Sequence, residues 1–185
     1  MHPSVAIWVL GGLAAASLLT MAAADIRERI IPNRLVLAVM GAGFALRLLA
    51  SPSEALISVI IWVCVLGGFG FLASRSLIGW GDAKMIPAVT LLAAPGEVPA
   101  LIAAIAISGG VLALVYLAAQ TALRRAGSDR TATRPHPLPG SRVPALRGLL
   151  NVLDIERARI LAREPMPYGV AILGGVAAHV VERIV

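Results

Sequence analysis

Long runs of apolar residues recur along this chain, and they limit its possible folds more than any other feature. Val5–Ala24 and Ala55–Ser74 carry no charged side chain at all. An α-helix rises about 1.5 Å per residue, so about 20 apolar residues match the hydrocarbon thickness of a bilayer. A soluble domain of 185 residues also needs a polar surface, which a mean hydropathy of +0.87 does not supply. The sequence therefore predicts an all-α, polytopic membrane protein.

Six apolar runs predict six transmembrane helices within a single membrane domain covering residues 1–185. The runs are Val5–Ala24, Leu35–Ala50, Ala55–Ser74, Met85–Gly96, Val98–Leu123 and Met166–Val181. The fourth is short and contains Pro87. Glycine pairs at Gly67-Gly68, Gly109-Gly110 and Gly174-Gly175 predict close helix packing, because small residues let helix backbones approach one another in lipid.

The positions of the basic residues predict which side of the membrane each connection lies on. All but Arg47 and Arg183 of the 16 lysines and arginines lie in the connections 25–34, 75–84 and 124–165. Lysine and arginine collect in cytoplasmic loops, so we expect these three connections inside the cell and both termini outside. This topology accounts for the net charge of +6 and gives no reason to expect a nucleic-acid partner.

The longest connection, 124–165, is basic and rich in proline in its first part. Leucines and isoleucines recur at roughly helical spacing within 143–163, with arginines between them. This pattern predicts an amphipathic helix lying on the cytoplasmic membrane surface. A solvated helix packed on the rest of the domain explains the same pattern.

The cysteine and histidine content argues against a metal site. Cys64 is the one cysteine and stands in an apolar run, where a packing role is expected. The three histidines, His2, His136 and His179, do not show the spacing of metal ligands. We therefore predict no metal and no cofactor.

Two aspartates stand at the predicted membrane boundary. Asp25 follows the first apolar run and Asp82 precedes the fourth, so the predicted topology places both at the cytoplasmic face. Two neighbouring carboxyl groups cannot both ionise easily, so the pKa of one of them rises. Such a pair shares a proton: one carboxylate can take a proton from water while the other donates one to a scissile carbonyl.

Less specific roles explain the same two residues. Asp25 could pair with Arg27 or Arg29, and Asp82 could cap a helix. Acidic residues at a membrane also serve as proton relays in transporters. The spacing of the aspartates alone does not choose among these roles.

The residues around each aspartate are more specific. Asp82 lies in Gly79-Trp80-Gly81-Asp82-Ala83-Lys84, a GxGD motif at the start of a membrane helix. Its glycines allow a tight turn and leave room for a substrate strand. Asp25 is followed by Pro32-Asn33, where the chain stops and restarts at the membrane face.

Together these features resemble the prepilin peptidase family of membrane aspartic proteases. The resemblance covers nearly the whole chain, including GxGD-x-K at the fourth run and Met166-Pro167-Tyr168-Gly169 at the sixth. It implies that Asp25 and Asp82 are the catalytic pair. The supporting motif residues are Gly79, Gly81, Lys84, Pro32 and Asn33, and Lys84 has a structural or substrate-orienting role.

The resemblance also implies a reaction, a partner and a location. Such enzymes remove the short basic leader of prepilins at the cytoplasmic face of the bacterial inner membrane, usually after a glycine. Larger members carry two CxxC pairs linked to zinc and to N-methylation, which this chain lacks. It resembles the short Tad-type form, whose substrate is a Flp-type prepilin. The alternatives are another GxGD intramembrane protease, a proton-coupled transporter and an assembly protein.

Overall fold

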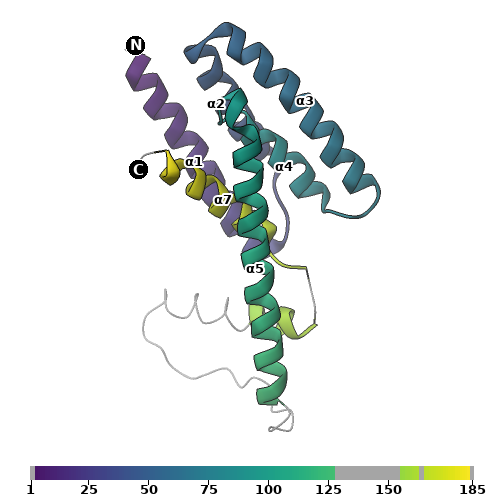
Figure 1. The fold of residues 1–185 in the computed structure, drawn as a ribbon. Helices are drawn as coiled ribbons and strands as arrows, with labels where there is room; N and C mark the ends of the chain where they lie inside the picture. Colours follow the sequence, from purple (N-terminus) through teal and green to yellow (C-terminus); the bar gives the residue numbers. More distant parts are fainter. Residues whose placement is uncertain (1–2, 128–154, 163–164, 184–185) are drawn as a thin grey trace. The chain divides into compact units, whose positions relative to one another are not determined.

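The computed structural model describes residues 3–127, 155–162 and 165–183, and the regular elements of these ranges are helical (Figure 1). The elements are α1 (Pro3–Glu28), α2 (Asn33–Ala50), α3 (Pro52–Ser74), α4 (Trp80–Thr90), the 3-10 helix η1 (Pro95–Glu97), α5 (Val98–Gly127) and α7 (Tyr168–Glu182). A further helical segment covers residues 155–162. The predicted all-α fold is confirmed for this part of the chain.

Four helices in the described ranges are long and apolar enough to cross a membrane: Val5–Glu28, Asn33–Ala50, Pro52–Ser74 and Pro95–Arg125. They correspond to the first, second, third and fifth predicted runs. With 11 and 15 residues, α4 and α7 are shorter than the about 20 residues that a bilayer requires. Six spans and the outside placement of both termini therefore stay predictions.

Prolines decide where several helices begin. Pro52 opens α3 and Pro95 opens η1, and the residue before each is extended, with ψ of 134° and 151°. A proline ring disfavours the helical conformation in the residue that precedes it. For this reason the fourth predicted run, Met85–Gly96, is not one continuous helix. The helix in this region begins earlier, at Trp80, and ends at Thr90.

The chain divides into two compact units, and the division falls within α5. The first unit contains Met1–Gly109 and Pro167–Val185, and the second contains Gly110–Met166. In the first unit α1 packs against α2 and α7, and α2 packs against α3 and α4. Because α4 also contacts α3 and α7, it is the central helix of this unit.

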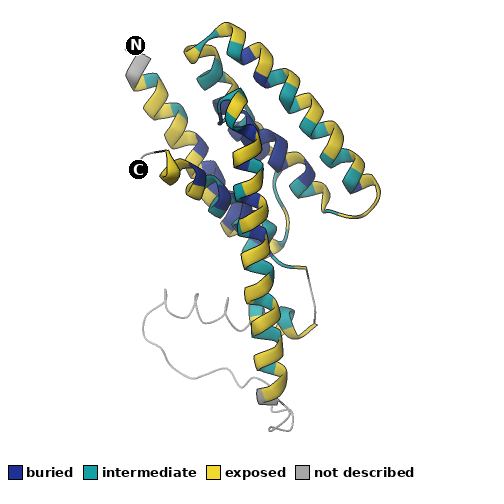
Figure 2. Cartoon of the chain, viewed as in Figure 1, coloured by how far each residue is buried: buried dark blue, intermediate teal, exposed yellow. Residues whose placement is uncertain are grey.

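Burial differs sharply between α4 and α3 (Figure 2). In α4, Ala83 and every residue from Met85 to Thr90 are buried, whereas the buried residues of α3 are Ala55, Ser58 and Ala73. The exposed surface of α3 is strongly apolar. It includes Leu56, Ile57, Ile60, Val63 and Phe71. An exposed apolar surface of this kind suits a lipid environment.

Glycines bring α7 close to α5 within the first unit. A Cβ added to Gly175 would collide with the backbone of Ile105, and one added to Gly174 would lie 2.6 Å from the Ser108 hydroxyl oxygen. The predicted packing role is confirmed for this pair. It is wrong for Gly67-Gly68 within the described chain, because nothing lies within 4 Å of a Cβ built at either position.

The second unit joins the end of α5 to the helical segment at 155–162. The Tyr116 hydroxyl donates to the Glu156 carboxylate, and the Gln120 side-chain amide donates to the Ile160 carbonyl oxygen at 3.1 Å. Of the amphipathic helix predicted over 143–163, this segment is helical and the rest lies outside the described residues.

Candidate active site

Asp25 lies in the last turn of α1, and its side chain is buried, with 7% of the residue exposed. The helix ends three residues later, where Arg29 adopts a left-handed conformation with φ of 55°. Pro32 then caps α2 and Asn33 is its first, exposed residue. The chain therefore stops and restarts in this segment as predicted, and Asp25 lies in the helical turn just before it.

A backbone amide from the other end of the chain reaches Asp25. The Gly169 N–H donates to Asp25 Oδ2 with an N···O distance of 2.6 Å. Gly169 is the second residue of α7, and a Cβ at this position would lie 2.7 Å from Met21 Sδ and 2.9 Å from Asp25 Oδ2. Only glycine allows the α7 backbone to approach the carboxylate this closely.

Asp82 lies in the first turn of α4, ahead of the apolar part of that helix. Gly79 precedes the helix, and a Cβ there would lie 3.1 Å from Asp82 Oδ2. A Cβ on Gly81 would lie 3.3 Å from the Ile31 side chain, so this glycine lets the connection between α1 and α2 pack on the start of α4. The two glycines of the motif thus have separate tasks. One leaves space beside the carboxyl group, and the other allows the two connections to touch.

The two carboxyl groups influence each other. The pKa of Asp82 is raised from 3.8 to about 6, first because burial removes water from the carboxyl group and second because of the Asp25 charge. Burial disfavours the charged form of an acid, and a nearby like charge does the same. Residues 57 positions apart in sequence therefore share one electrostatic environment. Such a pair is suited to holding one proton between two carboxyl groups.

Lys84, the last residue of the motif, does not face the interior. Lys84 is exposed, while Ala83 and Met85 on either side of it are buried. It therefore lies on the outward side of the central helix.

The start of α7 contributes two residues that the sequence did not identify as part of the site. Besides the Gly169 amide, Tyr168 interacts electrostatically with Asp82, and its ring lies against Gly109. The sequence did contain a signal, because Met166-Pro167-Tyr168-Gly169 is part of the resemblance to prepilin peptidases. It did not show that this start would meet the aspartates.

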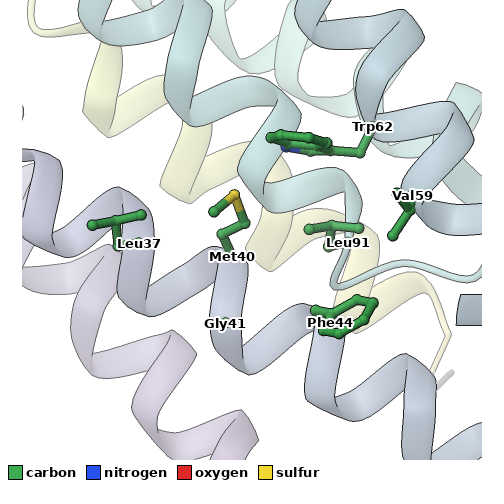
Figure 3. A pocket seen from close by; sticks show the side chains of 7 residues that line it. All are labelled: Leu37, Met40, Gly41, Phe44, Val59, Trp62 and Leu91. Carbon is green, nitrogen blue, oxygen red and sulfur yellow. The ribbon is translucent and has the colours of Figure 1, made fainter.

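An apolar cavity of about 250 Å³ lies at the other end of α4 (Figure 3). It is lined by Leu37, Met40, Gly41, Phe44, Val59, Trp62 and Leu91. The indole Nε1 of Trp62 is buried and has no hydrogen-bond partner among the described residues. Leu91 follows Asp82 by nine residues, or about 13 Å along a helix. The cavity can hold an apolar group, but it offers no acid or base.

Comparison with known proteins identifies the family of the chain. Residues 12–114 match the model of the type IV leader peptidase family. The chain belongs to the type IV leader peptidase family. The matched region is more than half of the chain and contains Asp25 and Asp82, whereas Tyr168 and Gly169 lie beyond it. No curated protein and no solved structure matches the chain.

Membership of this family implies a protease with a leader-peptidase type of activity and a prepilin-type substrate in general. With several long apolar helices, it indicates a multi-pass membrane protein. The resemblance to prepilin peptidases is thereby confirmed at the level of the family.

Proposed function

We propose that this leader peptidase is an aspartic endopeptidase that removes the leader of prepilins at the cytoplasmic face of the bacterial inner membrane. The observation that carries the proposal is the effect of the charge of the buried Asp25 on the half-buried Asp82. One carboxylate takes a proton from water as the water oxygen attacks the scissile carbonyl carbon. The other carboxylic acid donates its proton to the carbonyl oxygen.

The proposed topology has six membrane segments, with both termini outside and the basic connections 25–34, 75–84 and 124–165 inside. Four segments are helices of spanning length. In this arrangement α4 and α7 are shorter segments enclosed by the others, and the burial of α4 from Met85 to Thr90 supports that role. Asp25 and Asp82 then meet the leader where it leaves the membrane.

The proposed substrate is a Flp-type prepilin with a short basic leader that ends at a glycine. The chain has one cysteine, so it cannot form the two CxxC pairs of the larger relatives, and we propose cleavage without N-methylation. Pro32, Asn33, Gly79 and Gly81 shape the two connections at the site. The exposed Lys84 orients either the substrate or the loop.

Co-expression with a candidate prepilin tests the function. Asp25→Asn and Asp82→Asn should each lower leader removal about 10²- to 10⁴-fold, because asparagine cannot exchange a proton. The double variant should be no worse than either single variant, since residues that act as one unit are not additive. Leader removal is scored by a gel shift, and the amount of membrane-inserted protein is measured in parallel.

Glu182→Gln serves as the matched control, because Glu182 is an exposed acid at the far end of α7. It should cut normally. Wild-type cleavage by either aspartate variant would remove that residue from the mechanism. Loss of both variants from the membrane would instead indicate that the carboxylates hold the helices together.

A further inference from the structure

The hydrogen bond from Gly169 to Asp25 distinguishes the two aspartates. The Gly169 N–H is one of the first amides of α7, and these amides have no carbonyl partner within their own helix. It donates to Asp25 Oδ2 at 2.6 Å, which is short for a bond of this type. An amide that donates to a carboxylate stabilises its ionised form, and the positive end of the helix dipole acts in the same direction.

The surroundings of Asp82 have the opposite effect. Burial and the Asp25 charge raise the pKa of Asp82 to about 6. Within the described ranges, the ionisable groups that influence Asp82 are Asp25 from α1 and Tyr168 from α7, and neither is a cation. Gly79 lies beside Asp82 and has no side chain, so the space next to Asp82 Oδ2 stays open.

We propose that the Gly169 amide at the start of α7 holds Asp25 as the ionised member of the pair, which makes Asp25 the general base and Asp82 the general acid. Gly169 is then a positioning residue that acts through Asp25. This inference rests on the proposed aspartic mechanism and adds which aspartate is the base and which is the acid.

The assignment gives a balanced reaction. Asp25 removes a proton from water as the water oxygen bonds to the carbonyl carbon, and Asp82 gives its proton to the carbonyl oxygen, so a gem-diol forms. Asp25 then passes its proton to the leaving amide nitrogen as the C–N bond breaks. Asp82 recovers a proton from a gem-diol hydroxyl, which restores the starting protonation of both groups.

The sharpest test removes the N–H without adding atoms. Glycolic acid inserted at position 169 by nonsense suppression replaces the amide with an ester and breaks no bond within α7, because this amide has no intrahelical partner. We expect cleavage of the co-expressed prepilin to fall about 10- to 100-fold. The acidic limb of the pH–rate profile should move to higher pH, because the base loses a donor that favours its ionised form.

Gly169→Ala gives a second route, since its Cβ would push Asp25 away from the amide. The same shift in the acidic limb is expected. Gly175→Ala is the packing control: it disturbs the contact with Ile105 and should lower stability while leaving the pH profile of the folded protein unchanged. Gly110→Ala, where a Cβ meets nothing within 4 Å, should match the wild type in cleavage rate and pH profile.

Infrared spectra provide a readout apart from activity. We expect a protonated-carboxyl band that titrates near pH 6 and disappears in Asp82→Asn. If that band instead disappeared in Asp25→Asn and stayed in Asp82→Asn, the roles would be reversed. If the ester variant had the wild-type cleavage rate and pH–rate profile, this inference would be overturned, while the proposed aspartic mechanism would stand. If Asp25→Asn and Asp82→Asn both cleaved normally, the aspartic mechanism itself would be contradicted.

Discussion

Asp82 differs from an ordinary surface aspartate because the fold partly buries it and places a like charge near it. Its raised pKa means that the protonated form suits the folded site better than the ionised form does. The same shift affects both catalysis and stability, so either quantity can reveal it.

The first prediction concerns pH and stability. A carboxyl group whose pKa is raised on folding adds no cost below its unfolded value and destabilises the fold as pH rises through the folded value. Wild-type protein in detergent should therefore lose stability as pH rises from 3.8 past about 6, by at most about 3 kcal/mol. Asp82→Asn should lose less, so its melting temperature should exceed that of the wild type above this range. Parallel stability curves for the two proteins would contradict the shift.

The second prediction follows from the same pKa and concerns rate. If Asp82 is the general acid, leader removal should fall as pH rises through about 6, since the acid must carry its proton. The base must be ionised, so a bell-shaped profile is expected. The measurement is single-turnover cleavage across pH. A flat profile would count against a shared proton.

The third prediction concerns the end of α3, where Ser76 has φ of 58°. The Leu77 N–H donates to the Leu72 carbonyl and the Ser76 N–H donates to the Ala73 carbonyl, which is the Schellman pattern of helix ends. Glycine tolerates this conformation best, so Ser76→Gly should stabilise the protein by up to about 1 kcal/mol. Ser74→Gly, at the last residue of α3, should destabilise the protein by up to about 1 kcal/mol in the same thermal melt.

At the scale of elements, the burial of α4 depends on close contact with α2. Gly43 of α2 faces Leu91, and a Cβ at Gly43 would lie 2.8 Å from Leu91 Cβ and 2.9 Å from its carbonyl carbon. Part of the obstruction is backbone, so it cannot be relieved by turning a side chain. The packing of α2 on α4 therefore requires glycine at this position.

The fourth prediction tests this contact. Gly43→Ala should destabilise the detergent-solubilised protein by about 1–3 kcal/mol, because an added methyl group has no space. Gly67→Ala is the matched control on α3, where a Cβ meets nothing within 4 Å, and it should be neutral or stabilising by up to about 1 kcal/mol. Equal melting temperatures for the two variants would show that α2 and α4 do not meet as described.

At the scale of the whole molecule, the topology decides whether the two aspartates can meet a substrate leader. The charge distribution predicts that the basic connections lie inside, and in that topology the same side holds Asp25 and Asp82. A different orientation would leave the site intact but turn it away from the cytoplasm.

The fifth prediction is therefore about topology. Reporter fusions after Ser74 and within 128–140 should report the cytoplasm, and a fusion after Pro52 should report the outside. The expected pattern follows from the positive-inside rule. A periplasmic signal from the fusion within 128–140 would contradict the model and place the site on the wrong face for prepilin processing.

The sequence predicted the features that depend on local chemistry. Apolar runs marked the four long helices, because hydropathy is a property of consecutive residues. The third helix begins earlier than its predicted run, at Pro52 rather than Ala55, because proline is tolerated in the first turn of a helix. Asp25 and Asp82 were singled out as a pair from topology and motif, and the structure places them where one affects the pKa of the other. Their catalytic role stays a prediction.

Only the tertiary structure decided which distant groups meet at the site. The Gly169 amide reaches Asp25 across 144 residues, and neither local sequence indicates this partner. The burial of α4 from Met85 to Thr90 also comes from packing, since it depends on α2, α3 and α7 together. A contact of this kind results from how several helices fill space at once, so it belongs to no single segment of the chain.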